Sequence, residues 1–367
     1  MTQQDNQQDQ HAWLDGVPSW RRLALLYGGA TLALLALRLW SRPGAAAGAT
    51  ADGRVLTPAQ SPRLFRTLAR LRARLDGPAI TRVLVDDGFH AGLALRPRPW
   101  WRSWWPRPRH ELVLGLPFLL AASPREALSA VARDYAHLCR PQQHHAEAGW
   151  RARWSHALYR QRRRLVCLHR QLAGDALPAP LRRRLDRFIP FYLAATGGLA
   201  RDCEYAAERT ASAVFGASAN AGALVRATLL GRWIETQFWP TLFDQAALRP
   251  RPAFMPFSAM RTAFKASHAS WARPDLLAAA WRQPAADVAA PTLRERLLAC
   301  GQGPLLPAPV VSNAADVLLG RDTTRRLTHE LDRAWWSAER QAWRARYGAT
   351  RRGTADWTET GDAPAPE

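Results

Sequence analysis

The sequence almost lacks lysine. Lys265 is the only lysine in 367 residues, although the chain carries 51 basic residues against 30 acidic ones, a formal net charge of +21. An arginine bias this complete is typical of coding bias in a GC-rich genome, so the arginines alone do not indicate a ligand. The charge does favour non-specific attraction to anionic lipid headgroups or nucleic acid. We expect most of these arginines on a solvated surface.

Cysteine is also scarce, and its spacing is irregular. The four residues are Cys139, Cys167, Cys203 and Cys300, and none of them forms a C-x-x-C pair with another. This spacing indicates neither a disulfide framework nor a cysteine zinc site, and a reducing compartment is the simpler expectation. No internal repeat or low-complexity array is visible either. Hydrophobic residues at 47% and charged residues at 22% are typical of a folded globular protein with a sizeable core.

An uncharged apolar run follows a polar start. We expect residues 1–22 to be a disordered tail and residues 23–40 to be a membrane anchor. Eighteen helical residues span about 27 Å, enough for the hydrocarbon core. Trp20 and Trp40 stand where interfacial aromatic residues belong.

A cleaved signal peptide is the rival interpretation of this segment. Small residues at 45–49 support cleavage, but Arg38, Arg42 and Pro43 lie between the apolar run and that stretch. We therefore expect a single-pass membrane protein. The flanking arginines slightly favour placing the large C-terminal part in the cytoplasm.

The rest of the chain predicts an α+β protein that is predominantly helical. A basic amphipathic helix is expected at Pro58–Leu75, because its leucines recur on one face. A capping box with proline at the first helical position opens another helix at Ser123, which Pro141 ends. Strands are expected between these two helices, at Thr81–Val85, Ala91–Leu95 and Glu111–Leu120, and a late helix at Thr323–Tyr347.

A loop rich in tryptophan and arginine spans residues 96–109. Basic residues interleaved with aromatic ones stack on single-stranded bases or sit at a membrane interface. Packing of the loop on its own domain comes first among these interpretations, the membrane interface second and nucleic acid third.

Three short segments carry residues that bind metals or move protons. One is Arg133-Asp134-Tyr135-Ala136-His137, in the helix that begins at Ser123. The others, later in the chain, run from Glu204 to Glu208 and from Asp287 to Leu297. Each segment is weak alone, since a lone histidine on a helix is usually structural, but their order along the chain favours a shared site.

This ordered set resembles the HtpX-type membrane metallopeptidases, the group that includes the CAAX prenyl proteases. In that family one helix carries H-E-x-x-H, a later helix carries E-x-x-x-D, and a D-x-H-P segment precedes an arginine-rich helix start. The resemblance implies a zincin-like metallopeptidase domain with a small sheet at residues 57–305. A linker at 41–56 would precede it, and a helical extension at 306–349 and a polar tail at 350–367 would follow.

In that family two histidines at i and i+4 bind one Zn²⁺, and the glutamate after the first takes a proton from the zinc-bound water. A carboxylate from the second helix completes three protein ligands. By resemblance, His137 matches the second histidine and Glu204 the third ligand. Asp134 stands at the general-base position with a side chain one methylene shorter.

The departures from the pattern are severe. Arg133 stands where the first histidine belongs, and a guanidinium has no lone pair for a metal. Glu208 stands where the family has an aspartate. Asp287 matches the aspartate of the D-x-H-P segment, but Ala290 stands where its histidine belongs. Two ligands make a poor zinc site. Substitutes are distant, because His144 and His145 lie beyond Pro141 and off the helix, and His90 and His110 reach the site only if their loops fold back. We therefore expect zinc, the family's cofactor, to be absent. We expect Arg133 to lie near the vacant metal position and to pair with Glu204, with Glu208 a further partner.

Three functions follow as hypotheses. The first is a non-catalytic metallopeptidase-like protein that binds a protein or peptide partner through the retained groove. The second is an active zinc-dependent metalloendopeptidase with a non-standard site. The third is a basic protein that binds membrane surfaces or, without sequence specificity, nucleic acid.

Overall fold

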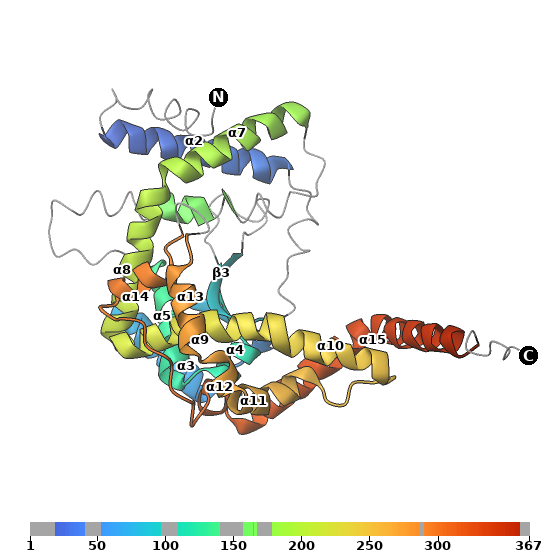
Figure 1. Cartoon of the computed structure of the whole chain (residues 1–367). Helices are drawn as coiled ribbons and strands as arrows, with labels where there is room; N and C mark the ends of the chain where they lie inside the picture. Colours follow the sequence, from blue (N-terminus) through green and yellow to red (C-terminus); the bar gives the residue numbers. More distant parts are fainter. Residues whose placement is uncertain are drawn as a thin grey trace, which may run out of the picture.

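A computed structural model of the chain describes residues 19–40, 53–96, 109–139, 157–163, 165–166, 178–285 and 290–359. Over these residues the protein is a predominantly helical α+β structure with one four-stranded sheet, as predicted (Figure 1). The Trp/Arg-rich stretch at 97–108, the tail at 1–18 and most of the predicted linker lie outside the described residues.

The sheet is mixed, and its strand order leaves β3 at one edge. The strands are β1 (Arg54–Leu56), β2 (Ile80–Asp86), β3 (Ala91–Arg96) and β4 (Arg109–Gly115), in the order β1-β2-β4-β3. Strands β2 and β4 run parallel, whereas β1 with β2 and β3 with β4 run antiparallel. Strand β1 lies inside the segment predicted as a linker, where Leu56 is buried in the core.

The third predicted strand, Glu111–Leu120, was wrong beyond Gly115. Helix α4 (Leu116–Ala121) begins there, with Pro117 in its first turn. All six of its residues are buried, so the continuous apolar run resembled a buried strand, and periodicity alone does not separate the two. Gly115 allows the close approach at this junction, because a Cβ there would lie 1.8 Å from the carbonyl oxygen of Gly88.

Helices α3, α5, α8 and α9 contribute, with the strands, to the main core. They span Pro62–Leu75, Pro124–Ala136, Gly197–Phe215 and Ala217–Trp233. The four leucines of α3 that share a face are all buried, as the helical spacing predicts. Helix α5 contacts β3, α8 and α9, so it lies centrally, between the edge of the sheet and the helical layer.

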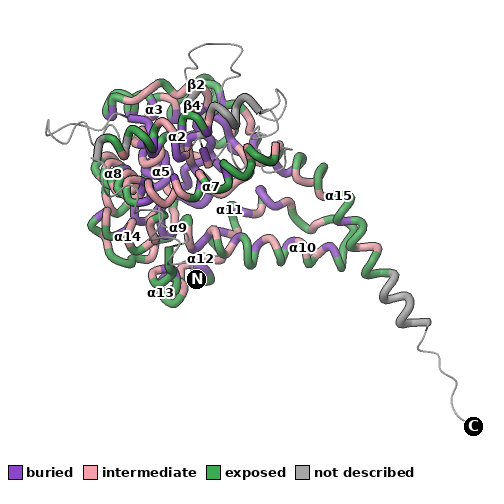
Figure 2. Tube along the Cα trace, turned by 90° about the horizontal axis from the view of Figure 1, so that it is seen from above, coloured by how far each residue is buried: buried purple, intermediate pink, exposed green. Residues whose placement is uncertain are grey.

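A second group of helices extends from this core. Here α9 continues into the π-helical turn η4 (Ile234–Phe238) and α10 (Trp239–Leu248), which pack on α15 (Arg321–Glu359) through the indole rings of Trp239, Trp335 and Trp343. Helix α15 runs outward to the C-terminal end and is mostly exposed (Figures 1 and 2). Its last ten residues fall in the predicted polar tail. The other elements are α11 (Pro256–Ala266), α12 (His268–Trp271), α13 (Pro274–Arg282), α14 (Leu293–Ala299) and η5 (Ala315–Leu319).

The apolar N-terminal segment forms helix α2 (Ser19–Trp40). It packs beside α7 (Ala179–Ala195) in a separate cluster that includes Leu26, Leu185 and Tyr192 (Figure 1). No helix in the described part of the chain combines the length and the apolar character of a membrane span. The membrane anchor therefore stays a prediction.

The capping box predicted at Ser123 is confirmed. The Ser123 hydroxyl accepts a hydrogen bond from the Glu126 N–H, and the Glu126 carboxylate accepts one from the Ser123 N–H at 2.7 Å. We expect Ser123→Ala to lower the free energy of unfolding by about 1 kcal/mol, because a donor at the start of α5 loses its partner. Urea denaturation measures this. Ser337→Ala, at an exposed position inside α15, serves as the control and is expected to leave the midpoint unchanged.

Candidate functional site

The site predicted from sequence is built on α5 and α8, which pack against each other. Helix α5 ends at Ala136, earlier than predicted, because i→i−3 hydrogen bonds from Leu138 and Cys139 tighten its last turn. His137 is therefore the C-cap residue, but its backbone is still helical, with φ −67° and ψ −14°. Arg133 and His137 thus keep the i, i+4 relationship that sets them on one face.

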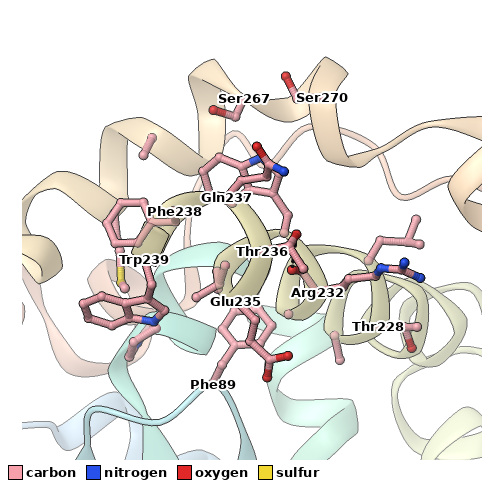
Figure 3. A pocket seen from close by; sticks show the side chains of 18 of the residues that line it. Phe89, Thr228, Arg232, Glu235, Thr236, Gln237, Phe238, Trp239, Ser267 and Ser270 are labelled. Atoms are coloured by element: carbon pink, nitrogen blue, oxygen red, sulfur yellow. Dashed lines mark hydrogen bonds between the residues drawn. The ribbon is translucent and has the colours of Figure 1, made fainter. Parts of the chain in front are cut away.

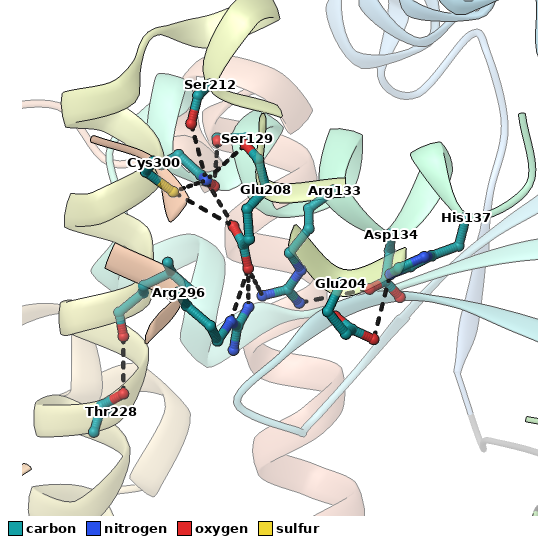
Figure 4. Close-up of polar contacts among 12 residues, drawn as sticks. Ser129, Arg133, Asp134, His137, Glu204, Glu208, Ser212, Thr228, Arg296 and Cys300 are labelled. Atoms are coloured by element: carbon teal, nitrogen blue, oxygen red, sulfur yellow. Dashed lines mark hydrogen bonds and ion pairs between the residues drawn. The ribbon is translucent and has the colours of Figure 1, made fainter. Parts of the chain in front are cut away.

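Arg133 lies beside two carboxylates, although not the one expected first. Its Nη1 lies 3.9 Å from Glu208 Oε1, and its Nη2 lies 3.5 Å from Asp134 Oδ1 (Figure 4). No ion pair joins Arg133 to Glu204 among the described residues, so the predicted order of its two glutamate partners was wrong. Burial disfavours the charged guanidinium, but the charges of Asp134, Glu208 and Glu204 outweigh it, and together they raise the pKa of Arg133.

Glu204 instead pairs with His137. The His137 Nε2 and Glu204 Oε1 atoms lie 3.5 Å apart, and the Tyr159 hydroxyl donates to the same carboxylate oxygen. Burial alone would raise the pKa of Glu204, but the hydrogen bond and charge of His137 lower it far below the usual range. Burial raises the pKa of Tyr159, so its phenol stays protonated and serves as a donor. The two residues that the resemblance predicts as metal ligands therefore meet in space.

Asp134 faces the edge of the sheet. Its Oδ2 accepts a hydrogen bond from the Leu93 N–H of β3 at 2.9 Å and lies 3.9 Å from an Arg163 nitrogen. The neighbouring Gly92 makes room, since a Cβ there would lie 2.9 Å from the same oxygen. The carboxylate at the general-base position is thus already engaged with the backbone of the edge strand.

Glu208 is the most deeply buried residue of the site, with no exposed surface. Its Oε1 accepts a hydrogen bond from Arg296 Nε at 2.7 Å, and its Oε2 accepts one from Asn220 Nδ2 at 2.7 Å (Figure 4). Sequence reasoning missed both partners. Arg296 belongs to the third of the segments named from the sequence, in its arginine-rich part, which forms α14.

The remaining candidates from the sequence lie elsewhere. Asp287 lies outside the described residues, and so do His144 and His145, the histidines that follow the α5 segment in the sequence. His90 follows β2 and pairs with Asp86 at 3.2 Å, and that hydrogen bond raises the pKa of His90 despite partial burial.

The side chains present do not fit a zinc ion. His137 and Glu204 supply two donor atoms, whereas a structural or catalytic zinc site in a protein takes three or four. Arg133 places a permanent cation where a third ligand would stand, close enough to act on Glu204 electrostatically. Across the ranges that the structure describes, no three histidine, cysteine, aspartate or glutamate side chains are grouped as a metal site.

A separate groove of about 1970 Å³ opens between the α9–η4–α10 run and helices α11 to α13. Ser267 and Ser270 lie on the wall opposite Thr236 and Gln237, and Trp239 lies to one side (Figure 3). None of the five described site residues on α5 and α8 lines it. Sequence reasoning missed this groove. Its wall includes the π-helical turn η4, and such turns often occur at functional positions.

Comparisons with models of protein families, with curated proteins and with solved structures found no match to this chain.

Proposed function

We propose that this chain is a non-catalytic protein, built on a metallopeptidase-like core, that binds a protein or peptide partner. One observation carries the proposal: Arg133, which stands where the resemblance implies a metal ligand, lies beside Asp134 and the buried Glu208. The Asp134 carboxylate, which would have to act as the general base, accepts a hydrogen bond from the Leu93 N–H. A general base must instead reach the proton that it abstracts.

The groove supports the binding part of the proposal. At about 1970 Å³ it is larger than the roughly 300–1,000 Å³ of common small-molecule pockets, which favours a polypeptide segment. Its lining mixes aromatic rings such as Trp233 and Trp239 with hydroxyl and amide side chains. Aromatic anchors with polar neighbours are typical of protein-binding surfaces.

We also propose that the N-terminal segment attaches the protein to a membrane. Leu25 and Leu32 of α2 are 55% and 68% exposed and lie seven residues apart, so they share one face of the helix. The exposed run Arg182–Arg184 on the adjacent α7 supplies positive charge for anionic headgroups.

Filling the groove tests the binding site. We expect Ser270→Trp to weaken binding of an unfolded polypeptide by about tenfold or more, because the indole occupies space opposite Thr236. The probe is a reduced, carboxymethylated and fluorescently labelled protein, followed by fluorescence anisotropy. Ser218→Trp, exposed on α9 outside the groove, is the matched control and is expected to bind like the natural chain. Equal affinity for all three proteins would refute the groove as the binding site.

One observation favours the second hypothesis, an active zinc endopeptidase. His137 and Glu204 come within 3.5 Å of each other, as two ligands of one metal would. A peptide-library digestion with added Zn²⁺, read by mass spectrometry, separates the two functions. We expect no cleavage above that of a His137→Ala variant, and cleavage that the variant loses would establish the enzyme.

A further inference from the structure

Arg133 forms fewer hydrogen bonds than a buried guanidinium needs. It has five N–H donors, but its contacts with carboxylates lie at 3.5 and 3.9 Å, longer than the roughly 2.7–2.9 Å of a charge-assisted hydrogen bond. Its Nε is buried and has no hydrogen-bond partner among the described residues. Buried polar groups are almost always paired, so this side chain has donors available for a ligand.

Arg163 lies beside the second carboxylate oxygen of Asp134, whereas Arg133 lies beside the first. Its Nη2 lies 3.9 Å from Asp134 Oδ2 and 3.5 Å from the Leu93 carbonyl oxygen. Both arginines thus approach Asp134 without a close contact, and Asp134 itself is held by the Leu93 N–H at 2.9 Å. Side chains of Arg133, Asp134 and Arg163 keep 21%, 16% and 33% of their surface exposed, so a small group reaches them.

The edge of β3 limits what kind of ligand fits. The Leu93 N–H donates to Asp134, and the Leu93 carbonyl accepts from Arg163, so side chains occupy both backbone groups that an added strand would pair with. An extended peptide therefore does not extend the sheet at this position. A compact group with two acceptor oxygens matches the free N–H donors of two guanidinium groups better.

The local charge favours a singly charged ligand. Arg133, Arg163 and Arg296 pair with Asp134 and Glu208, while Glu204 pairs with His137, so the site holds as many guanidinium groups as carboxylates. A near-neutral site holds a monoanion through directed hydrogen bonds and not through net charge. The donors of the site do not compensate the additional charges of a polyanion, so its binding is less favourable.

We propose that Arg133 and Arg163 bind a carboxylate of the partner polypeptide, either its C-terminal carboxylate or an acidic side chain. The ligand takes N–H donors that Asp134 does not satisfy, while Asp134 keeps its hydrogen bond to Leu93. The inference rests on the proposed function, because a zinc ion at this position would bind the same carboxylate itself.

Isothermal titration calorimetry at constant ionic strength tests this inference. The probes are N-acetyl-glycyl-glycine, its C-terminal amide, and N-acetyl-aspartic acid amide. We expect the first to bind and its amide to give no heat. The aspartic acid amide decides the source: binding as strong as that of the glycyl peptide points to acidic side chains, and weaker binding points to a chain terminus.

Variants locate the site. Arg133→Gln is expected to weaken carboxylate binding by about tenfold to a hundredfold, as is Arg163→Gln, which keeps the test valid if the first variant unfolds. Arg133→Lys keeps the charge but loses the fork, and we expect it to bind more weakly than the natural chain. Arg70→Gln, exposed on α3, is the control and should bind normally.

Two results would overturn the inference: equal binding by the natural chain and both glutamine variants, or equal heats from the peptide and its amide. Zinc is measured in the same samples. If the natural chain contains no zinc and does not bind N-acetyl-glycyl-glycine, only the carboxylate site is refuted. If it contains one zinc per chain, the proposed function is refuted.

Discussion

Glu208→Ala is expected to lower the free energy of unfolding by about 3–5 kcal/mol, the largest loss that we anticipate from a single change in this site. The Glu208 carboxylate is fully buried, and it pairs with Arg296 at 2.7 Å and faces Arg133 at 3.9 Å. Its removal leaves two guanidinium groups without their shared counter-charge, and it removes the closest acceptor of the Asn220 amide, which keeps only longer contacts to the Glu208 backbone oxygen, the Ser212 hydroxyl and the Cys300 sulfur. Chemical denaturation monitored by circular dichroism measures the change.

Two further variants show whether charge pairing is the cause. Asp275→Ala removes an exposed carboxylate that also pairs with an arginine, and it is expected to leave the unfolding midpoint unchanged. Adding Arg133→Met to Glu208→Ala is expected to recover part of the lost stability, because one unpaired cation is removed as well. A loss below about 1 kcal/mol in Glu208→Ala would contradict the account of a carboxylate that holds two arginines.

Arg133→His is expected to convert the site into one that binds zinc. The change removes a fixed positive charge and places a second imidazole one turn before His137, on the same face of α5. With Glu204 beside His137, the site then has the two histidines and one carboxylate of a catalytic zinc centre. We expect about one zinc per chain after dialysis, with an affinity measured against a chromophoric chelator.

Matched variants define what this gain requires. Arg133→Gln removes the same charge without adding a ligand, and it should bind no zinc. Adding His137→Ala or Glu204→Ala to Arg133→His should abolish the gain. Zinc retention in the double variants would mean that histidines elsewhere in the chain bind the metal. Peptide cleavage by Arg133→His is expected to stay undetectable, because Asp134 remains bonded to the Leu93 N–H.

Most of the fold followed from local patterns in the sequence. The leucine face of α3, the capping box at Ser123 and the short strands each have a local physical cause, so the α+β class was predictable. The change from β4 to α4 was not, because a run in which every side chain is buried has no period. Pro117 in the first helical turn was the available signal.

The site was predictable in its members but not in its pairing. Motif order indicated that residues 133, 137, 204 and 208 meet, but which carboxylate Arg133 approaches depends on how α5 packs on α8. Tyr159, which donates a hydrogen bond to Glu204, comes from another segment and belongs to no motif. The groove was missed for a similar reason, since its two walls come from helices that no sequence pattern brings together.

The metal content of the natural chain tests the central claim most directly. The protein is expressed with added zinc, purified without chelators, and analysed for zinc and protein by mass spectrometry. Because Arg133 stands where the resemblance implies a ligand, and only His137 and Glu204 meet there as donors among the described residues, we predict well below one zinc per chain, unchanged in His137→Ala and Glu204→Ala. One tightly bound zinc per chain, lost in either variant, would contradict the account.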